Sequence, residues 1–306
     1  PLRDGTQSVG FTLSANDKVR VAQRLDDFGV AFIEGGWPGS NPKDVEFFER
    51  ARDMQWKNAL IAAFGSTCRV KVGPEDDANI KALLDSNTPV CTIFGKTWTL
   101  HVKEVLQTTP EDNLRIIEQS VAYLKSNNKR VIYDAEHFFD GYKADSSYAL
   151  ETLQAAIRGG AETIILCDTN GGTLPWEVER IIRDLKLVIK SPFGIHTHND
   201  GECAVVNALM AVREGAIQVQ GTINGVGERC GNANLCSIMA DLELKMGYQC
   251  LPVGNIEHLY DLSHFVAEVA NITPDEHLPF IGKSAFAHKG GVHVAAMRRS
   301  AQSYQH

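Results

Sequence analysis

Short apolar runs alternate with longer amphipathic stretches along most of the chain. Each run is only a few residues long and apolar almost throughout, as expected for a strand whose two faces are both buried. Glycine, proline, serine and asparagine gather between the runs and the stretches, where they are typical of turns. The pattern predicts seven parallel strands, at 30–34, 58–64, 89–94, 130–136, 162–168, 191–198 and 216–223.

The amphipathic stretches carry their apolar residues at the 3.6-residue period of a helix. The first of them has clear ends, because Ser14 and Asp17 form a capping-box pattern and Gly29 follows the last apolar position. Further helices are predicted from residue 44 and at about 75–86, 111–126, 146–158, 173–189, 203–213, 233–246 and 255–270.

The order of these elements is a strand–helix repeat in which the early strand ends recur about every 30 residues. Eight such units in roughly 250 residues make a TIM (β/α)8 barrel, which is the fold we predict. Seven strands are visible and residues 1–4 would be the tail of an eighth, so we expect the first strand to be truncated. A doubly wound open sheet is the alternative, but the glycine-rich segments lack the GxGxxG turn of a dinucleotide site.

The last part of the chain has a different character. After a predicted helix, Pro274 and Pro279 lead into the glycine-rich run Ala287–His293. We therefore expect a catalytic barrel over residues 1–250 and a small helical and irregular subdomain over 251–306.

Composition narrows the class of protein. The 306 residues are 43% hydrophobic and 22% charged, with a formal net charge of −8, which is typical of a globular protein and unlike a nucleic-acid-binding surface. No apolar run approaches the roughly 20 residues of a membrane span. The seven cysteines form no CxxC pair or disulfide framework, which favours a reducing, cytoplasmic location.

Polar side chains collect at the predicted strand ends, which is where TIM barrels place their active sites. His196 and His198 lie two positions apart at one strand end, so both imidazoles would point the same way and could share a metal ion. Asp4 could complete an N/O site for a divalent ion with open positions. For the histidine pair alone, two ordinary polar residues at a strand end would be an equally good interpretation.

Four further residues have both a structural and a functional interpretation. Asn232 could be a helix N-cap or could add an amide oxygen to the metal site. Arg3 could form an ion pair or stabilise a developing oxyanion. Glu136 could bond a loop, hold a substrate or move a proton, and His293 would by default be a solvated loop residue.

Three motifs in this order resemble those of the DRE-TIM metallolyase superfamily: Leu2–Gln7, His196–Asp200 and Gly225–Asn234. Within it, the chain resembles the 2-isopropylmalate, homocitrate and citramalate synthase group. The stretches Ile33–Pro42 and Tyr133–Tyr142 look most like its citramalate synthase branch. The resemblance covers nearly the whole chain. It departs from the superfamily at Pro1, where a threonine is usual.

The resemblance implies a role for each matching position. The implied metal ligands are Asp4, His196, His198 and Asn232. Arg3 would polarise the substrate ketone, Glu136 would belong to the substrate pocket and Thr169 would contact the keto acid. His293 would reach the active site of a neighbouring subunit, which implies a homodimer. The metal could be Mg²⁺, Mn²⁺ or Zn²⁺.

The implied reaction is a Claisen-type condensation of acetyl-CoA with a 2-oxo acid, with Glu136 or His293 as the candidate base. We expect pyruvate and citramalate mainly because Gly35–Pro42 and Asp134–Tyr142 resemble the citramalate synthase branch. Phe64 and Phe94 could form a small apolar wall or could equally be barrel packing, and no further Arg or Lys ends a predicted strand to bind a second carboxylate. The alternatives are 2-oxoisovalerate as substrate, a lyase of the same superfamily, or an inactive scaffold or regulatory chain. The regulatory domain usual in these synthases would begin beyond His306, so we expect no feedback inhibition of this chain.

Overall fold

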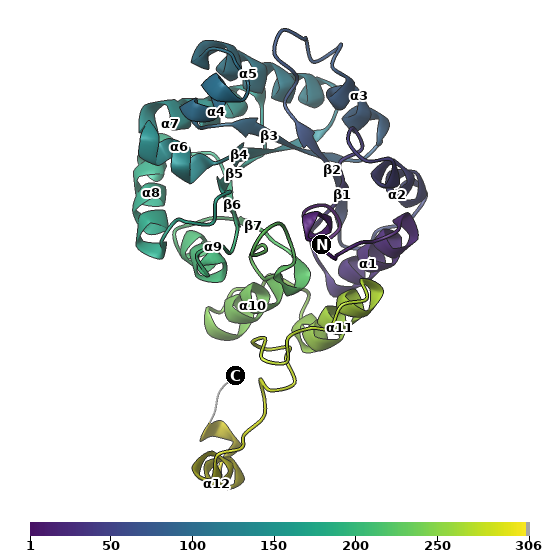
Figure 1. Ribbon diagram of the computed structural model, residues 1–306, viewed down its shortest axis with the longest axis vertical. Helices are drawn as coiled ribbons and strands as arrows, with labels where there is room; N and C mark the ends of the chain where they lie inside the picture. Colours follow the sequence, from purple (N-terminus) through teal and green to yellow (C-terminus); the bar gives the residue numbers. More distant parts are fainter. Residues whose placement is uncertain (304–306) are drawn as a thin grey trace.

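Seven parallel strands form one curled sheet, with the helices on its outer side (Figure 1). The computed structural model describes residues 1–303, and the last three residues of the predicted 251–306 subdomain lie outside the described residues. The strands are β1 (Phe32–Gly36), β2 (Leu60–Ser66), β3 (Val90–Lys96), β4 (Arg130–Glu136), β5 (Thr163–Asp168), β6 (Phe193–Thr197) and β7 (Gln218–Gln220). Their spatial order is their sequence order, which confirms the parallel strand order predicted for the barrel.

The helices that cover the sheet agree closely with the amphipathic pattern. They are α1 (Ala15–Phe28), α2 (Pro42–Arg52), α3 (Ala78–Asp85), α5 (Pro110–Ser126), α7 (Ser146–Gly159), α8 (Pro175–Val188), α9 (Ala204–Arg213), α10 (Leu235–Ala240) and α11 (Leu259–Val269). In α1 the Ser14–Asp17 capping box is formed, and Gly29 ends the helix with a left-handed φ of 98°. The last barrel helix is shorter than predicted, because α10 gives way to a π-helical turn over Asp241–Lys245.

The sequence pattern missed several short elements. Three are helices, α4 (Thr99–Glu104), α6 (Phe138–Ala144) and α12 (Gly291–Arg299), and the first two follow strand ends directly. The others are short 3-10 turns at Gly5–Gln7, Ile223–Gly225 and Ala301–Ser303. A further 3-10 turn, at Asn255–His258, falls within the helix predicted at about 255–270. The predicted strand 216–223 is reduced to β7, because the chain turns sharply at Asn224, which has a left-handed φ of 65°. Within residues 1–303, no helix combines the length and the apolarity needed to cross a membrane.

The interior of the sheet has two layers. The lower layer is apolar and comprises Ala62, Val90, Ile132, Ile165 and Cys167, all buried. The side chains toward the carboxyl ends of the strands are mostly polar or aromatic. This division follows from strand alternation, since positions two apart on one strand share a face. On β4, for example, Ile132 belongs to the apolar layer and Asp134 lies two positions further along the same face.

The sheet has no strand pairing between β7 and β1 among the described residues. The N-terminal residues and the segment around α10 occupy this side of the ring (Figure 1). A cavity of about 810 Å³ runs along it, lined by both edge strands, by Arg3 and Asp4, and by α10. The cavity connects the upper polar layer of the interior with the unpaired edges.

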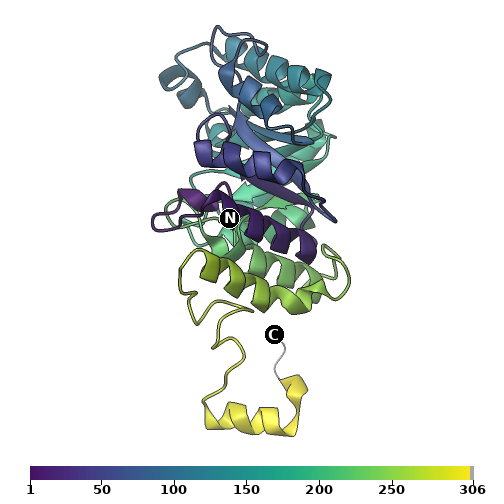
Figure 2. The ribbon, with the colours of Figure 1, turned by 90° about the vertical axis from the view of Figure 1, so that its right-hand side faces the viewer.

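The C-terminal segment has two parts. Helix α11 packs against α1, and its Leu262 and Val266 are buried in the main core. Helix α12 has no buried residue and lies apart from the barrel at the end of an extended segment (Figures 1 and 2). The run Ala287–His293, predicted to be irregular, therefore ends inside a helix.

Candidate active site and metal centre

Four side chains from distant parts of the sequence meet at the carboxyl ends of the strands. His196 lies on β6 and His198 follows that strand, while Asp4 precedes the turn at Gly5–Gln7. Asn232 comes from the loop before α10, which is fastened to β6 by an antiparallel bridge between Asn232 and His198. All four are at most 8% exposed. The structure thus brings together the four predicted metal ligands.

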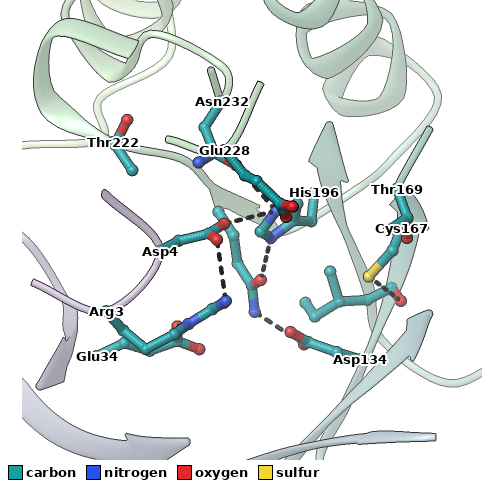
Figure 3. A network of polar contacts seen from close by, with 12 residues as sticks. Arg3, Asp4, Glu34, Asp134, Cys167, Thr169, His196, Thr222, Glu228 and Asn232 are labelled. Atoms are coloured by element: carbon teal, nitrogen blue, oxygen red, sulfur yellow. Dashed lines mark hydrogen bonds and ion pairs between the residues drawn. The ribbon is translucent and has the colours of Figure 1, made fainter. Parts of the chain in front are cut away.

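The ligand atoms lie close enough for one ion. His196 Nε2 is 3.1 Å from Asp4 Oδ2 and 3.1 Å from Asn232 Oδ1 (Figure 3). Potential ligand atoms of Asp4, His196 and His198 all lie within 4.8 Å of one another. Among the described residues, the buried Nδ1 of His198 has no hydrogen-bond partner. Carboxylate, amide oxygen and imidazole are ligands that divalent ions accept, so this donor set fits a metal ion.

The charges of the cluster also favour a bound cation. Burial opposes ionisation of Asp4, but Arg3 and the two histidines outweigh it and hold the pKa of Asp4 well below its usual range. Burial also disfavours the charged form of His196, yet the hydrogen bond and charge of Asp4 raise its pKa to about 9. Burial and the charge of His196 lower the pKa of His198 to about 4. One positive charge is therefore favoured among these acceptors, and a proton or a cation can supply it.

The alternative role of Asn232 as a helix cap is wrong. The N-cap of α10 is Asn234, whose side chain accepts a hydrogen bond from the backbone N–H of Cys236. Asn232 instead donates from Nδ2 to the carbonyl of Val226 at 3.3 Å, which leaves Oδ1 facing His196. Two asparagines separated by one residue made the cap assignment ambiguous in sequence.

Arg3 is held on three sides beside the metal ligands. Its Nε donates to Glu34 Oε2 at 2.9 Å, and a terminal nitrogen lies 3.1 Å from Asp4 Oδ1. The guanidinium carbon sits 3.7 Å from the ring centroid of Phe64, a distance at which a cation is attracted to the aromatic face. Both the ion-pair and the oxyanion interpretations remain compatible, because a guanidinium has five N–H donors.

An aromatic cluster forms the wall next to Arg3. Phe64 and Phe94 stack with their centroids 5.5 Å apart, and Trp37 meets both edge-on at 5.7 and 5.6 Å. Trp37 is fixed by two hydrogen bonds, from its N–H to Asp44 at 2.8 Å and from Nε1 to Asn79 at 2.7 Å. The sequence suggested the two phenylalanines, and Trp37 is an addition from the structure.

The opposite side of the mouth consists of paired groups. Glu136 forms an ion pair with Lys96, the last residue of β3. The sequence-based expectation that no further Arg or Lys ends a strand is therefore wrong, because β3 continues two residues past Phe94. Thr169 Oγ1 accepts a hydrogen bond from the backbone N–H of His137 at 2.8 Å, and His137 has a left-handed φ of 55°.

Sequence reasoning also missed a hydrogen-bond chain inside the barrel. His196 Nδ1 lies 2.8 Å from Gln220 Oε1, and Gln220 Nε2 donates to Asp134 Oδ1 at 2.9 Å. Burial, reinforced by the charge of Glu34, raises the pKa of Asp134 to about 7. Strand alternation could have revealed Asp134, because it lies two positions before Glu136 on one strand.

His293 is not brought to these residues within the chain. It lies in α12, where its ring centroid is 6.5 Å from that of His288, and α12 stands apart from the barrel (Figure 2). Its predicted contribution to a neighbouring subunit stays a prediction.

Known proteins place the chain in a family. A family model described as HMGL-like matches residues 1–270. The (R)-citramalate synthase of Geobacter sulfurreducens is 56% identical over 305 residues, covering 100% of this chain and 58% of that protein. The 2-isopropylmalate synthase of Pyrococcus furiosus is 33% identical over 310 residues, covering 99% of this chain and 60% of that protein. The chain thus spans less than two thirds of these curated relatives.

Solved structures show the same fold. The hydroxymethylglutaryl-CoA lyase of Pseudomonas aeruginosa superposes with a TM-score of 0.73 at 19% identity, over 89% of this chain and 92% of that one. The match of the family model over most of the sequence confirms the resemblance suggested by the three motifs. The chain belongs to the HMGL-like family.

Proposed function

We propose that this chain carries the catalytic site of a citramalate synthase, which condenses acetyl-CoA with pyruvate. The observation that carries the proposal is the meeting of Asp4, His196, His198 and Asn232 beside an arginine that is stacked on Phe64. The similarity to (R)-citramalate synthases over the whole chain supports it. Acetyl-CoA and a 2-oxo acid are its small-molecule substrates.

The chemistry divides between a bound divalent ion and Arg3. The ion, held by the four ligands, would supply Lewis acidity to the ketone and carboxylate oxygens of the oxo acid. Arg3 keeps N–H donors beyond those that face Glu34 and Asp4, and these can stabilise negative charge that develops on the ketone oxygen. Because its neighbours fix the guanidinium in place, little reorganisation is needed during the reaction.

A base must remove a methyl proton from acetyl-CoA. Glu136 lies at the mouth of the barrel, where its ion pair with Lys96 keeps it in place. His293 is the second candidate, and we propose that it acts in the site of a second subunit of a homodimer. The exposed position of α12, which buries none of its residues within this chain, supports that arrangement.

Pyruvate is the proposed oxo acid because of the side of the site that would face its methyl group. Phe64, Phe94 and Trp37 offer a compact apolar wall beside Arg3. Lys96 is paired with Glu136, so a second substrate carboxylate would have to compete for it. Each methylene is discriminated by only about 1–3 kcal/mol, so some turnover of 2-oxobutyrate is expected.

Coenzyme A release from acetyl-CoA tests the proposal. The assay is run with pyruvate, 2-oxobutyrate, 2-oxoisovalerate and 2-oxoglutarate, and we expect the highest kcat/KM for pyruvate. A higher value for 2-oxoisovalerate would assign an isopropylmalate synthase. Formation of acetyl-CoA from a hydroxyacyl-CoA would indicate a lyase, and no reaction with any acid would indicate an inactive scaffold.

The free state of the seven cysteines supports a reducing, cytoplasmic location.

A further inference from the structure

A continuous hydrogen-bond chain crosses the interior of the barrel from the metal site to a buried carboxylate. It runs from His196 on β6 through Gln220 on β7 to Asp134 on β4, with distances of 2.8 and 2.9 Å (Figure 3). His196 and Gln220 are register partners on neighbouring strands, while β4 lies across the interior. The chain therefore links three strands through one glutamine side chain.

The orientation of the Gln220 amide fixes the direction of each hydrogen bond. Gln220 donates from Nε2 to Asp134 Oδ1. Its Oε1 is then left for His196, and an amide oxygen can only accept. The proton on this side of the imidazole must therefore sit on Nδ1. In the neutral ring, Nε2 is left with its lone pair.

That lone pair faces oxygens and no donor. Asp4 Oδ2 and Asn232 Oδ1 are each 3.1 Å from Nε2. A positive charge must join these electron-rich atoms; a proton can supply it in the metal-free chain, and a bound metal ion can replace that proton. The opposite tautomer, with its proton on Nε2, would block a metal ion at this position.

We propose that Asp134 and Gln220 are positioning residues that hold His196 in the tautomer with Nδ1 protonated, so that Nε2 is available to a metal ion. The inference rests on the metal site of the proposed function. Asp134 acts through the amide: its carboxylate sets the orientation of Gln220, and Gln220 sets the tautomer of His196. Such partners of metal-bound histidines orient the ring and adjust its basicity.

The burial of Asp134 argues against a purely structural role. It is 3% exposed, and within residues 1–303 the amide of Gln220 is the one side-chain donor bonded to it. A carboxylate in such a place costs free energy relative to an apolar residue such as Ile132, which lies two positions earlier on the same face. An aspartate in place of an apolar side chain adds no packing contacts to the barrel interior. A role toward the metal site accounts for it.

Binding of Mn²⁺ to the whole chain, measured by electron paramagnetic resonance, tests the proposal without an activity assay. We compare wild type with Gln220→Leu, Asp134→Asn and the double variant. Outer-shell partners of this kind typically contribute 10–100-fold in affinity, and we expect a loss in this range for Gln220→Leu. Asp134→Asn should weaken binding about 10-fold, since an amide no longer fixes the orientation of Gln220. The double variant should bind no more weakly than Gln220→Leu, because Asp134 acts only through Gln220.

Gln218→Leu is the matched control. It is the same substitution on the same strand and the same face, at similar burial and two positions further from the site. We expect its Mn²⁺ affinity to stay within about twofold of wild type. A ¹⁵N spectrum of the histidine rings, recorded with Mg²⁺ bound, should show protonated Nδ1 on His196 in wild type.

Each contrary outcome is decisive. If the losses of Mn²⁺ affinity add up in the double variant, or if Gln218→Leu loses as much affinity as Gln220→Leu, Asp134 and Gln220 do not position His196, and the metal site itself stands. Wild-type Mn²⁺ affinity in Gln220→Leu would lead to the same conclusion. If wild type itself binds no Mn²⁺, Mg²⁺ or Zn²⁺, the metal site and with it the proposed function fail. Thermal unfolding of the metal-free variants separates these results from misfolding.

Discussion

The two halves of the barrel mouth differ in how their polar and charged side chains are paired. The metal half, made of Asp4, His196, His198 and Asn232, turns acceptors toward one another. In the paired half, made of Lys96, Glu136, His137, Asp140 and Thr169, each charged or polar group meets a partner within the chain, as in the contact of 3.1 Å between His137 Nδ1 and Asp140 Oδ2. The strands deliver both halves to the same face.

The metal half, unlike the paired half, needs a bound cation or proton. A cluster of buried acceptors is stable only when a cation or a proton joins it, so the metal half is adapted to binding. A set of internal ion pairs is complete without a ligand, so the paired half is adapted to holding side chains in place. Mutations should therefore separate metal affinity from stability according to the half in which they fall.

The largest expected effect is the loss of a ligand from the metal half. His198→Ala should lower Mn²⁺ affinity by more than the 10–100-fold of an outer-shell partner and abolish coenzyme A release. The metal-free fold should survive, because the buried Nδ1 of His198 has no hydrogen-bond partner to lose among the described residues. Mn²⁺ titration and circular dichroism of the same sample measure both. Full metal-dependent activity in this variant would remove His198 from the site.

Arg3 lies at the border between the halves, and its substitution should separate catalysis from binding. Arg3→Ala is expected to lower kcat about 10²–10³-fold, the scale for losing one oxyanion partner, with Mn²⁺ affinity nearly unchanged. Arg3→Lys should not restore the rate, since an ammonium cannot both stack on Phe64 and bond Glu34 as the guanidinium does. Steady-state kinetics decide the matter. Wild-type kcat in the lysine variant would reduce Arg3 to an ion-pair partner.

Subunit mixing tests whether α12 reaches the active site of a second molecule. His293→Ala and His196→Ala chains, each inactive alone, should regain activity when mixed. In a mixed dimer one site draws both lesions and the other draws none, so random exchange gives about a quarter of wild-type activity. Coenzyme A release is measured after mass spectrometry has shown that subunits exchange. Absence of any recovery would place His293 outside a shared site.

The smallest effect is expected in the paired half itself. Lys96→Met should cost about 1 kcal/mol of stability, because the ion pair with Glu136 is partly exposed, and Mn²⁺ affinity should not change. Urea unfolding and Mn²⁺ titration provide the two measurements. Weaker Mn²⁺ binding in this variant would show that the two halves are coupled. Glu136→Gln is the companion variant, since it breaks the same pair from the other side.

Sequence patterns predicted the regular parts of this molecule well. The strand at 130–136 has its predicted limits, because buried parallel strands are apolar runs with sharp polar ends. The short helices α4 and α6 were missed because they have only 6 and 7 residues, too few to show a helical period, and begin soon after a strand ends. Asp4, His196 and His198 came from strand-end placement and Asn232 from motif resemblance. Lys96 was missed because β3 runs past its predicted end, and Gln220 because its contacts depend on how side chains cross the interior. Such contacts are set by register between strands, which a single sequence does not display.

The position of Asp4 gives the metal site a second, mechanical meaning. The N-terminal residues lie on the side of the ring where β7 and β1 do not pair (Figure 1). There Asp4 meets His196 of β6, which also contacts Asn232. An ion bound by all of them would be a cross-link that closes a loop of roughly 190 residues, and the entropic effect of such a cross-link grows slowly with loop length. Because the cross-link is reversible, the free energy of unfolding would rise with the free ion concentration, by about 2.7 kcal/mol at 100 times the dissociation constant. The stability of the fold would then depend on the supply of free metal.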